Sequence, residues 1–504
     1  MNKLSKILGS AILVASLMSN TAFAFEGAKT EITKKSFYQT NTKLIDIELK
    51  KGMIAGELDE ALYLAIRYGR DPEIIDYLLK KGANVNGKNA HHLKHIFNAA
   101  YYGTFEQLKA FLKHEPDITV LDDSKRTAFL RAFYGQQDLR AIRLMIKHGF
   151  KIDAKDLSGT NAIYTASYRN SLEVVKFLVE QGLDPKSMSQ LSGENTIFRA
   201  TNGPNAVEII KYLQGLGVDH KLVSYKDQNI VTYMSERSRR SKHIDLFKTF
   251  VAEGISQHDK DENGRDALLI AAYRNDDLSF IKYLVETGSD INAVDKSDRN
   301  ALNIASYRNK EKVVKYFIEA GLDVNTSDVD GKTSLLWSAT RNNGSVKVIE
   351  ALLAAGADAT ARDKDGNNAI MLVVSRDVSS KTEKGSVKEI LKILVAAGDD
   401  LNMVNVKGET ALIKAAQFGH HLDTLQYLVE NGQDVNAANS YKLTPLMYAA
   451  MKASNVEVLE YLLSKGAKTD PVDDFGDAAI DLVKENELLK NTNAVELIEK
   501  AAKM

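Results

Sequence analysis

Tyrosine and arginine recur together along this chain, and they are its residue types best suited to hold another molecule. Tyr273-Arg274 and Tyr307-Arg308 are two copies of the pair, spaced roughly 34 residues apart. Both residue types are enriched at binding hot spots, and the planar guanidinium of arginine can hold a carboxylate through two parallel hydrogen bonds. Pairs that repeat at a fixed interval predict a binding surface rather than a catalytic centre.

Equivalent positions in the other copies extend this surface along most of the chain. The predicted partner-binding residues are Arg67, Tyr68, Tyr101, Tyr102, Tyr168, Arg169, Arg237, Tyr273, Arg274, Tyr307, Arg308, Arg341, Arg376 and Phe418. Their arginines predict a protein partner with an acidic surface. The alternative is a purely structural role, in which these arginines pair with acids of neighbouring hairpins. Those acids are Asp261, Asp295, Asp328 and Asp363.

Two other clusters have residue types capable of chemistry. His91 and His95 are four residues apart, so a helix would place them on one face, but two histidines do not complete a metal site. No metal and no other cofactor is therefore predicted. Arg237, Arg239, Arg240 and Lys242 form a basic cluster, interpreted as a solvated loop or an extension of the arginine row. The formal net charge of −1 argues against a general nucleic-acid binder.

Sequence motifs of catalysis are missing from the 504 residues. There is no G-x-S-x-G nucleophile elbow, no phosphate-binding G-x-x-x-x-G-K-[ST] loop and no H-E-x-x-H zinc motif. The chain also has no cysteine, which excludes disulfides and thiolate chemistry. The sequence therefore predicts that the protein is not an enzyme.

The elements that position the tyrosine–arginine pairs repeat with the same period. Each copy opens with a residue favoured as a helix N-cap: Thr127, Asn161, Asn195, Asn229, Asp266, Asn300, Thr333, Asn368, Thr410 and Thr444. A second amphipathic stretch follows and ends at a glycine that predicts a left-handed C-cap: Gly82, Gly149, Gly182, Gly217, Gly254, Gly288, Gly321, Gly356, Gly398, Gly432 and Gly466. Each copy is thus predicted to form helix, turn, helix and an extended hairpin.

This arrangement resembles the ankyrin repeat over about residues 56–504. Thr444-Pro445-Leu446-Met447-Tyr448-Ala449 is the copy nearest to the Thr-Pro-Leu-His-x-Ala signature of the family, and the histidine is replaced in every copy. The resemblance implies an all-α solenoid of about twelve repeats. It also implies that the helix ends carrying the tyrosines and arginines point into a concave groove where partners bind.

The chain divides into four predicted segments. Residues 1–24 have the charged start, apolar run and small residues Ala22 and Ala24 of a signal peptide. Residues 25–55 form an N-terminal segment that caps the array, residues 56–472 form the repeats, and residues 473–504 form a capping repeat. No stretch after the leader is long and apolar enough to span a membrane. We expect an exported, monomeric protein, in the periplasm or fully secreted.

Together these features predict a non-catalytic protein-interaction module or scaffold that acts outside the cytoplasm. By resemblance to exported bacterial ankyrin proteins, two further functions stay open. One is regulation of a periplasmic enzyme, and the other is that of an effector secreted towards a host cell.

Overall fold

The computed structural model describes residues 55–68, 71–89, 91–237, 242–340, 346–376, 386–419 and 422–503. The predicted signal peptide and nearly all of the predicted N-terminal segment lie outside these residues. Two predicted binding residues are also affected. Arg341 lies outside the described residues, and for Arg237 only the backbone is described, at the end of a helix.

The helices form two compact units, Met1–Ile230 and Val231–Met504, a division that the sequence did not predict. In unit 1, the first helices of the repeats are α3 (Ala55–Tyr68), α5 (His95–Tyr102), α7 (Ala128–Ala132), α9 (Ala162–Arg169) and α11 (Thr196–Ala200). The second helices are α4 (Pro72–Lys80), α6 (Phe105–Leu112), α8 (Leu139–Lys147), α10 (Leu172–Glu180) and α12 (Ala206–Gly215).

Unit 2 contains the remaining helix pairs, beginning at the boundary with α13. Its first helices are α13 (Ile230–Arg237), α15 (Ala267–Arg274), α17 (Ala301–Arg308), α19 (Ser334–Ala339), α21 (Ala369–Val373), α23 (Ala411–Gln417), α25 (Pro445–Lys452) and α27 (Ala479–Glu485). Its second helices are α14 (Lys242–Ala252), α16 (Leu278–Glu286), α18 (Glu311–Glu319), α20 (Val346–Ala354), α22 (Ser386–Ala396), α24 (Leu422–Glu430), α26 (Glu457–Ser464) and α28 (Ala494–Ala501).

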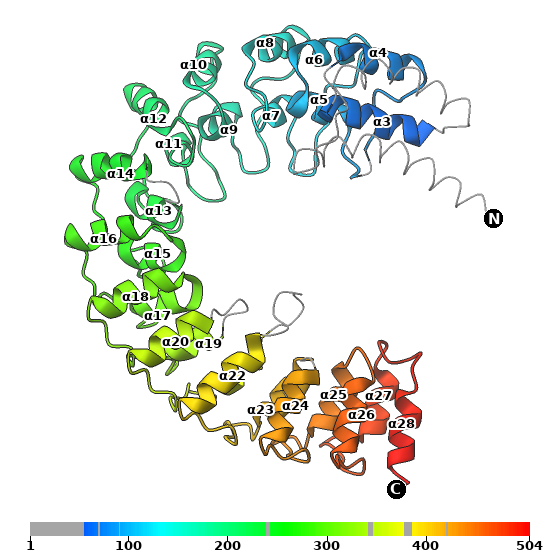
Figure 1. Ribbon diagram of the computed structural model, residues 1–504. Helices are drawn as coiled ribbons and strands as arrows, with labels where there is room; N and C mark the ends of the chain where they lie inside the picture. Colours follow the sequence, from blue (N-terminus) through cyan, green and yellow to red (C-terminus); the bar gives the residue numbers. More distant parts are fainter. Residues whose placement is uncertain are drawn as a thin grey trace, which may run out of the picture. The chain divides into compact units, whose positions relative to one another are not determined.

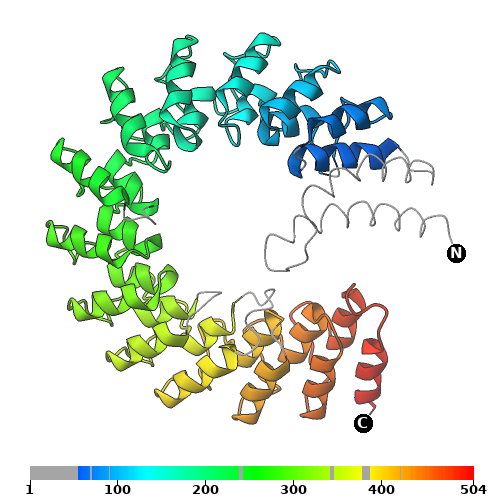
Figure 2. The ribbon, with the colours of Figure 1, turned by 45° about the horizontal axis from the view of Figure 1, so that its top comes forward.

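Within each unit the helices form two parallel rows (Figures 1 and 2). Most odd-numbered first helices pack beside the next odd-numbered helix of their unit, as α15 does beside α17 and α17 beside α19. The even-numbered second helices pack in the same way, as α18 does beside α20. Every repeat therefore contacts mainly its neighbours, which is the packing of a solenoid. The predicted all-α solenoid is confirmed.

Side chains at the starts of the first helices explain why these short helices form. Nine of the ten predicted N-cap residues accept a hydrogen bond from a backbone amide in the first turn. Thr444, for example, accepts from the amide of Met447 at 3.3 Å. Each such bond satisfies an amide that would otherwise lack a partner and contributes about 1 kcal/mol.

The second helices hold the two rows together through one apolar face. In α16 that face consists of Phe280, Ile281 and Leu284, all fully buried. Burial of each such side chain stabilises the fold by roughly 1.5–3 kcal/mol. The chain then leaves the helix through Gly288, whose φ of 97° requires a residue without a Cβ. All eleven predicted helix-ending glycines have positive φ.

The hairpins between repeats are turns rather than strands. The described residues contain three isolated β-bridges and no strand. Successive turns are nevertheless linked by backbone hydrogen bonds, such as Lys296 N to Asn263 O at 2.9 Å and Val329 N to Ser297 O at 3.1 Å. These bonds set the register of one turn on the next, and so they fix the side chains that the turns present.

Candidate partner-binding site

Two consecutive repeats of unit 2 carry the tyrosine–arginine pairs at the C-terminal ends of α15 and α17. Tyr273 and Tyr307 are half-buried, whereas Arg274 and Arg308 are exposed. The Arg274 Cζ atom lies 5.2 Å from the ring centroid of Tyr273. The Arg308 Cζ atom lies 5.0 Å from the Tyr307 ring and 5.7 Å from the Tyr273 ring, so it bridges two repeats. Cation–π contacts of this kind are worth about 0.5–1 kcal/mol at exposed sites.

A buried asparagine follows each of these arginines and links adjacent repeats. Asn309 donates from Nδ2 to the carbonyl oxygens of Ala272 at 3.0 Å and Asn275 at 2.8 Å. Asn275 itself donates to the carbonyl oxygen of Ser235 at 3.4 Å. Because the asparagine satisfies the carbonyl groups of the preceding repeat, the arginine before it points outwards. Arg308 has no carboxylate partner among the described residues, whereas Arg274 pairs with Glu236 of α13 at 3.3 Å.

Arg376 departs from the predicted surface. Its side chain is only 3% exposed, although it occupies the position equivalent to Arg308. It donates from Nε to the carbonyl oxygen of Ala339 at 2.6 Å and from Nη2 to that of Ser338 at 3.1 Å. Ala339 is the equivalent of Ala272, so Arg376 performs the bridging role that Asn309 has two repeats earlier. We therefore leave Arg376 out of the binding surface.

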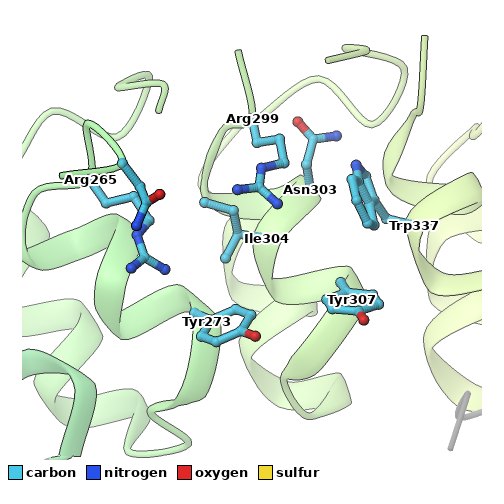
Figure 3. A pocket seen from close by; sticks show the side chains of 8 residues that line it. Arg265, Tyr273, Arg299, Asn303, Ile304, Tyr307 and Trp337 are labelled. Atoms are coloured by element: carbon cyan, nitrogen blue, oxygen red, sulfur yellow. The ribbon is translucent and has the colours of Figure 1, made fainter. Parts of the chain in front are cut away.

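A pocket of about 430 Å³ opens between these repeats (Figure 3). Its lining residues come from the turns and first helices of three successive repeats: Asn263, Arg265, Tyr273, Arg299, Asn303, Ile304, Tyr307 and Trp337. The Tyr307 and Trp337 rings meet edge to face, with centroids 5.2 Å apart and planes at 68°. The volume is within the range of about 300–1,000 Å³ found for ligand sites.

The pocket arginines are held by carboxylates of their own turns. Arg265 donates to Oδ2 of Asp261 from Nε at 3.0 Å and from Nη2 at 2.8 Å. Arg299 does the same with Asp295, at 2.9 and 2.7 Å. The two aspartate side chains are each 1% exposed. The turn acids therefore hold the turn arginines, and not the predicted helix-end arginines as the structural alternative required.

The other two turn acids are also engaged within their own repeats. Asp328 accepts a hydrogen bond from Nε1 of Trp337 at 2.9 Å, which fixes the indole ring at the edge of the pocket. Asp363 accepts from Nδ2 of Asn367 at 3.1 Å. Sequence reasoning missed Arg265, Arg299 and Trp337 as surface residues. The Asp-x-x-x-Arg spacing of Asp261–Arg265 and Asp295–Arg299, which forms an ion pair in both turns, is the sequence signal that could have identified the two arginines.

Unit 1 has a related surface at the ends of α3 and α5. The Arg67 Cζ atom lies 4.9 Å from the Tyr68 ring centroid and 5.0 Å from the Tyr102 ring centroid. Tyr101 and Tyr102 are in contact, with centroids 4.3 Å apart. Burial raises the pKa of Tyr102, with the positive charge of Arg67 acting in the opposite direction. This end of the array is richer in tyrosine than the pocket region.

Further along unit 1, Tyr168 at the end of α9 lies between two arginines. The Cζ atoms of Arg169 and Arg199 lie 4.8 and 4.7 Å from its ring centroid. Arg169 is exposed, and Asn170, the residue after it, is buried and donates to the carbonyl of Gln136. The arrangement around Asn309 in unit 2 is thus repeated in unit 1.

In unit 2, Phe418 at the end of α23 is 44% exposed but lacks an arginine beside it.

The histidines near the start of α5 differ in their surroundings. His95 is fully buried at the start of α5, whereas His91 and His92 are exposed in the preceding turn. Burial lowers the pKa of His95 to about 4, so the ring is neutral near pH 7. Among the described residues, no group of three or more His, Asp or Glu side chains is placed to hold a metal ion. No described helix is long and apolar enough to cross a membrane.

Comparison with known proteins identifies the repeat. The family model for ankyrin repeats in sets of three matches residues 96–189, 235–328, 268–363 and 377–473, and the single-repeat model matches residues 59–90. The chain belongs to the ankyrin repeat family. Ankyrin repeats are protein-interaction modules that are generally non-catalytic. Membership of the family therefore supports the prediction of a protein-interaction module.

Individual relatives match only parts of the chain. An ankyrin repeat protein of Acanthamoeba polyphaga mimivirus is 26% identical over 230 residues, which is 44% of this chain and 29% of the relative. A palmitoyltransferase of Lachancea kluyveri is 30% identical over 147 residues, 28% of this chain and 20% of the relative. The crystal structure of the human ASB11 ankyrin repeat domain is 25% identical, with a TM-score of 0.40, covering 47% of this chain and 98% of that one. The matched part of this chain thus spans less than a third of the length of the mimivirus protein and of the palmitoyltransferase.

Proposed function

We propose that this ankyrin repeat protein is a non-catalytic module that binds an acidic protein surface through the tyrosine–arginine pairs of its first helices. The observation that carries the proposal is the state of the helix-end arginines. Arg169 and Arg308 are exposed, and each lies against a tyrosine ring. Neither has a carboxylate partner among the described residues. A cation that is positioned on an aromatic ring, but not neutralised, is ready to bind a carboxylate of another protein.

Removing one pair from each unit tests the proposal. We expect Tyr307→Ala/Arg308→Ala, and separately Tyr168→Ala/Arg169→Ala, to weaken partner binding by at least about 2 kcal/mol. The expected loss combines a ring that leaves the interface and a cation that no longer holds a carboxylate. Binding of the partner obtained from the native extract would be measured by calorimetry for the full chain and for each variant.

A matched control comes from the row of second helices. Lys282→Ala/Tyr283→Ala removes an adjacent cation and aromatic ring from α16, where Lys282 is exposed and Tyr283 half-buried. The control should fold and bind as the unmodified chain does. Equal affinity of all the variants, with unchanged circular dichroism, would refute a role for the helix-end pairs. Binding that did not weaken with added salt would refute an acidic partner surface.

We also propose that the protein acts outside the cytoplasm, because residues 1–24 have the pattern of a signal peptide. Fractionation of the source cells, with an antibody against the chain, tests this. Protein in the periplasmic fraction, shortened by the length of the leader, would support a periplasmic binding module or a regulator of a periplasmic enzyme. Protein only in the culture medium would favour a host-directed effector, and protein in the cytoplasm at full length would exclude export.

A further inference from the structure

We propose that the pocket between α15, α17 and α19 binds an extended, acidic segment of the partner protein. Arg265 and Arg299 each take one carboxylate, and an apolar side chain between the two carboxylates packs on Tyr307 and Trp337. The inference rests on the proposed protein-binding function and specifies the chemistry of the segment that this part of the surface takes.

The free edges of the two pocket arginines carry the first step. A guanidinium can bind carboxylates along two edges, one formed by Nε with Nη2 and the other by both Nη atoms. In Arg265 the first edge is occupied by Asp261, and in Arg299 it is occupied by Asp295. No hydrogen bond from a described residue occupies the second edge of either arginine, so this edge remains for a ligand. Because the aspartate already fixes the side chain, little rotamer freedom is lost when a second carboxylate binds.

Aromatic rings provide the apolar part of the pocket. The Trp337 ring is held by its hydrogen bond to Asp328 and by its edge-to-face contact with Tyr307. Ile304 completes the apolar lining (Figure 3). The Arg299 Cζ atom lies 5.6 Å from the Trp337 ring centroid, so cation and apolar surface are adjacent. A cationic ligand is disfavoured at this place, whereas an apolar side chain next to a carboxylate fits both surfaces.

The period of the array sets the spacing of the two carboxylates. Arg265 and Arg299 occupy equivalent positions in consecutive repeats, and packed helices lie about 8–10 Å apart. An extended polyproline-II segment rises about 3.1 Å per residue with three residues per turn. Residues three positions apart therefore project to the same side at about 9 Å, which matches the separation expected for arginines on repeats packed about 8–10 Å apart. The expected segment has acidic residues at positions i and i+3.

Charge on the turns argues for a peptide over a nucleic acid. Glu262 and Asp298 are exposed in the same turns as the two pocket arginines. They interrupt the basic surface, so a continuous phosphate backbone would be repelled where separate carboxylates can be placed. The formal net charge of −1 for the whole chain also offers no general attraction for a polyanion.

The single tryptophan of the chain provides a direct readout, because Trp337 lines the pocket. The probe is a blocked hexapeptide without aromatic residues, with two glutamates three positions apart and a leucine between them. We expect it to change Trp337 fluorescence in a saturable way when added to the full chain. The same peptide with glutamines should bind at least tenfold more weakly, and so should an isomer with adjacent glutamates.

Variants of the protein complete the test. Arg265→Lys/Arg299→Lys keeps both ion pairs with the aspartates, but lysine lacks the second guanidinium edge that binds a carboxylate through two hydrogen bonds. This variant should reduce the preference for the glutamate peptide over the glutamine peptide at least fivefold. Arg126→Lys is the matched control, since Arg126 makes the same turn ion pair with Asp122 in unit 1. The control should leave peptide binding unchanged.

The outcomes separate this inference from the proposed function. An unchanged Trp337 signal at millimolar peptide, equal binding of the glutamate and glutamine peptides, or saturation by a single-stranded oligonucleotide instead would overturn the inference. The proposed function would survive that result if Tyr168→Ala/Arg169→Ala, which changes residues of unit 1 that do not line the pocket, still abolished partner binding. If neither helix-end double variant affected partner binding, the proposed function itself would fail.

Discussion

Unit 2 contains two stretches with the same helical scaffold and different surfaces. In the pocket stretch, α15 to α19, the helix ends present exposed arginines on tyrosine rings, and the turns present Arg265 and Arg299. In the C-terminal stretch, α21 to α25, the equivalent arginine is the buried Arg376. The turn position there carries Glu409, which pairs with Lys414 at 3.0 Å. The same fold therefore exposes arginines at these helix-end and turn positions in one stretch and not in the other.

The residue after the arginine explains much of the difference. Asn309 follows Arg308 and satisfies the carbonyl groups of the preceding repeat, so that Arg308 is exposed. Asp377 follows Arg376, and the guanidinium of Arg376 instead satisfies the carbonyl of Ala339, which is equivalent to that of Ala272, together with the carbonyl of Ser338. A buried carbonyl without a donor costs about 1–3 kcal/mol, which is enough to decide where an arginine points. A helix-end arginine is thus a surface residue only where a neighbour takes over the contact between repeats.

The largest predicted effect concerns Asp399, which occupies a position that is apolar in several other repeats. After the helix-ending glycine, the pocket stretch has Ser289 and Leu322 and the next repeat has Ala357, whereas the C-terminal stretch has Asp399 and Gln433. Asp399 accepts from the Ile370 amide at 3.1 Å, as Gln433 does from Leu412 at 3.0 Å. Burial raises the pKa of Asp399 to about 7. The folded chain therefore binds this proton more tightly than the unfolded chain, whose value is about 3.9.

The contribution of Asp399 to the free energy of unfolding should be fully present below about pH 4 and lost as the pH rises through 7, a change of about 4 kcal/mol. We expect Asp399→Gln, which copies Gln433, to remove this pH dependence. The effect is measured between pH 4 and 8 as the urea dependence of hydrogen exchange at the amides of α21 and α22. The exposed neighbour Asp400 gives the control Asp400→Asn. If the stability of the unmodified chain and of Asp399→Gln changed with pH in the same way, the pH dependence could not come from Asp399.

The second prediction compares the two equivalent arginines directly. Arg376→Ala should destabilise the junction of α19 and α21 by about 3 kcal/mol, because two buried carbonyl groups lose their donors and a cavity remains. Arg308→Ala should cost less, about 1 kcal/mol, since it removes only two exposed cation–π contacts, but it should weaken partner binding. Chemical denaturation and calorimetry distinguish the two. Equal losses of stability would remove the distinction between a bridging and a binding arginine.

The sequence predicted the scaffold better than the surface. N-caps such as Thr444 and glycines such as Gly288 act locally, through the amide or φ angle at one position, so their types alone predict helix starts and ends. The orientation of Arg376 depends on carbonyl groups 37 and 38 residues earlier, which no local pattern shows. The triplet Tyr-Arg-Asn, present at Tyr307 and absent at Arg376, is a signal that would have separated the two cases. No comparable sequence pattern predicted the division into two units.

Asn309→Ala provides the third prediction, with a smaller effect. It removes two hydrogen bonds between repeats and should cost about 2 kcal/mol, localised at the junction of α15 and α17. Hydrogen exchange of the amides in these helices measures the loss. Asn292→Ala serves as the control, because Asn292 is exposed in a turn of the same unit. If Arg308 then reached the carbonyl of Ala272 as Arg376 reaches that of Ala339, the expected loss would be reduced and binding would fall instead.

The smallest predicted effect tests whether the two stretches share one scaffold. Thr333 caps α19 in the pocket stretch, accepting from the Leu336 amide at 3.4 Å, and Thr444 caps α25 in the C-terminal stretch at 3.3 Å. Both bonds satisfy the same first-turn amide, so Thr333→Ala and Thr444→Ala should each cost about 1 kcal/mol, as measured by urea unfolding. Serine at either position should restore most of the loss. Unequal costs would mean that the difference between the stretches begins in the helices themselves, before any residue of the binding surface is considered.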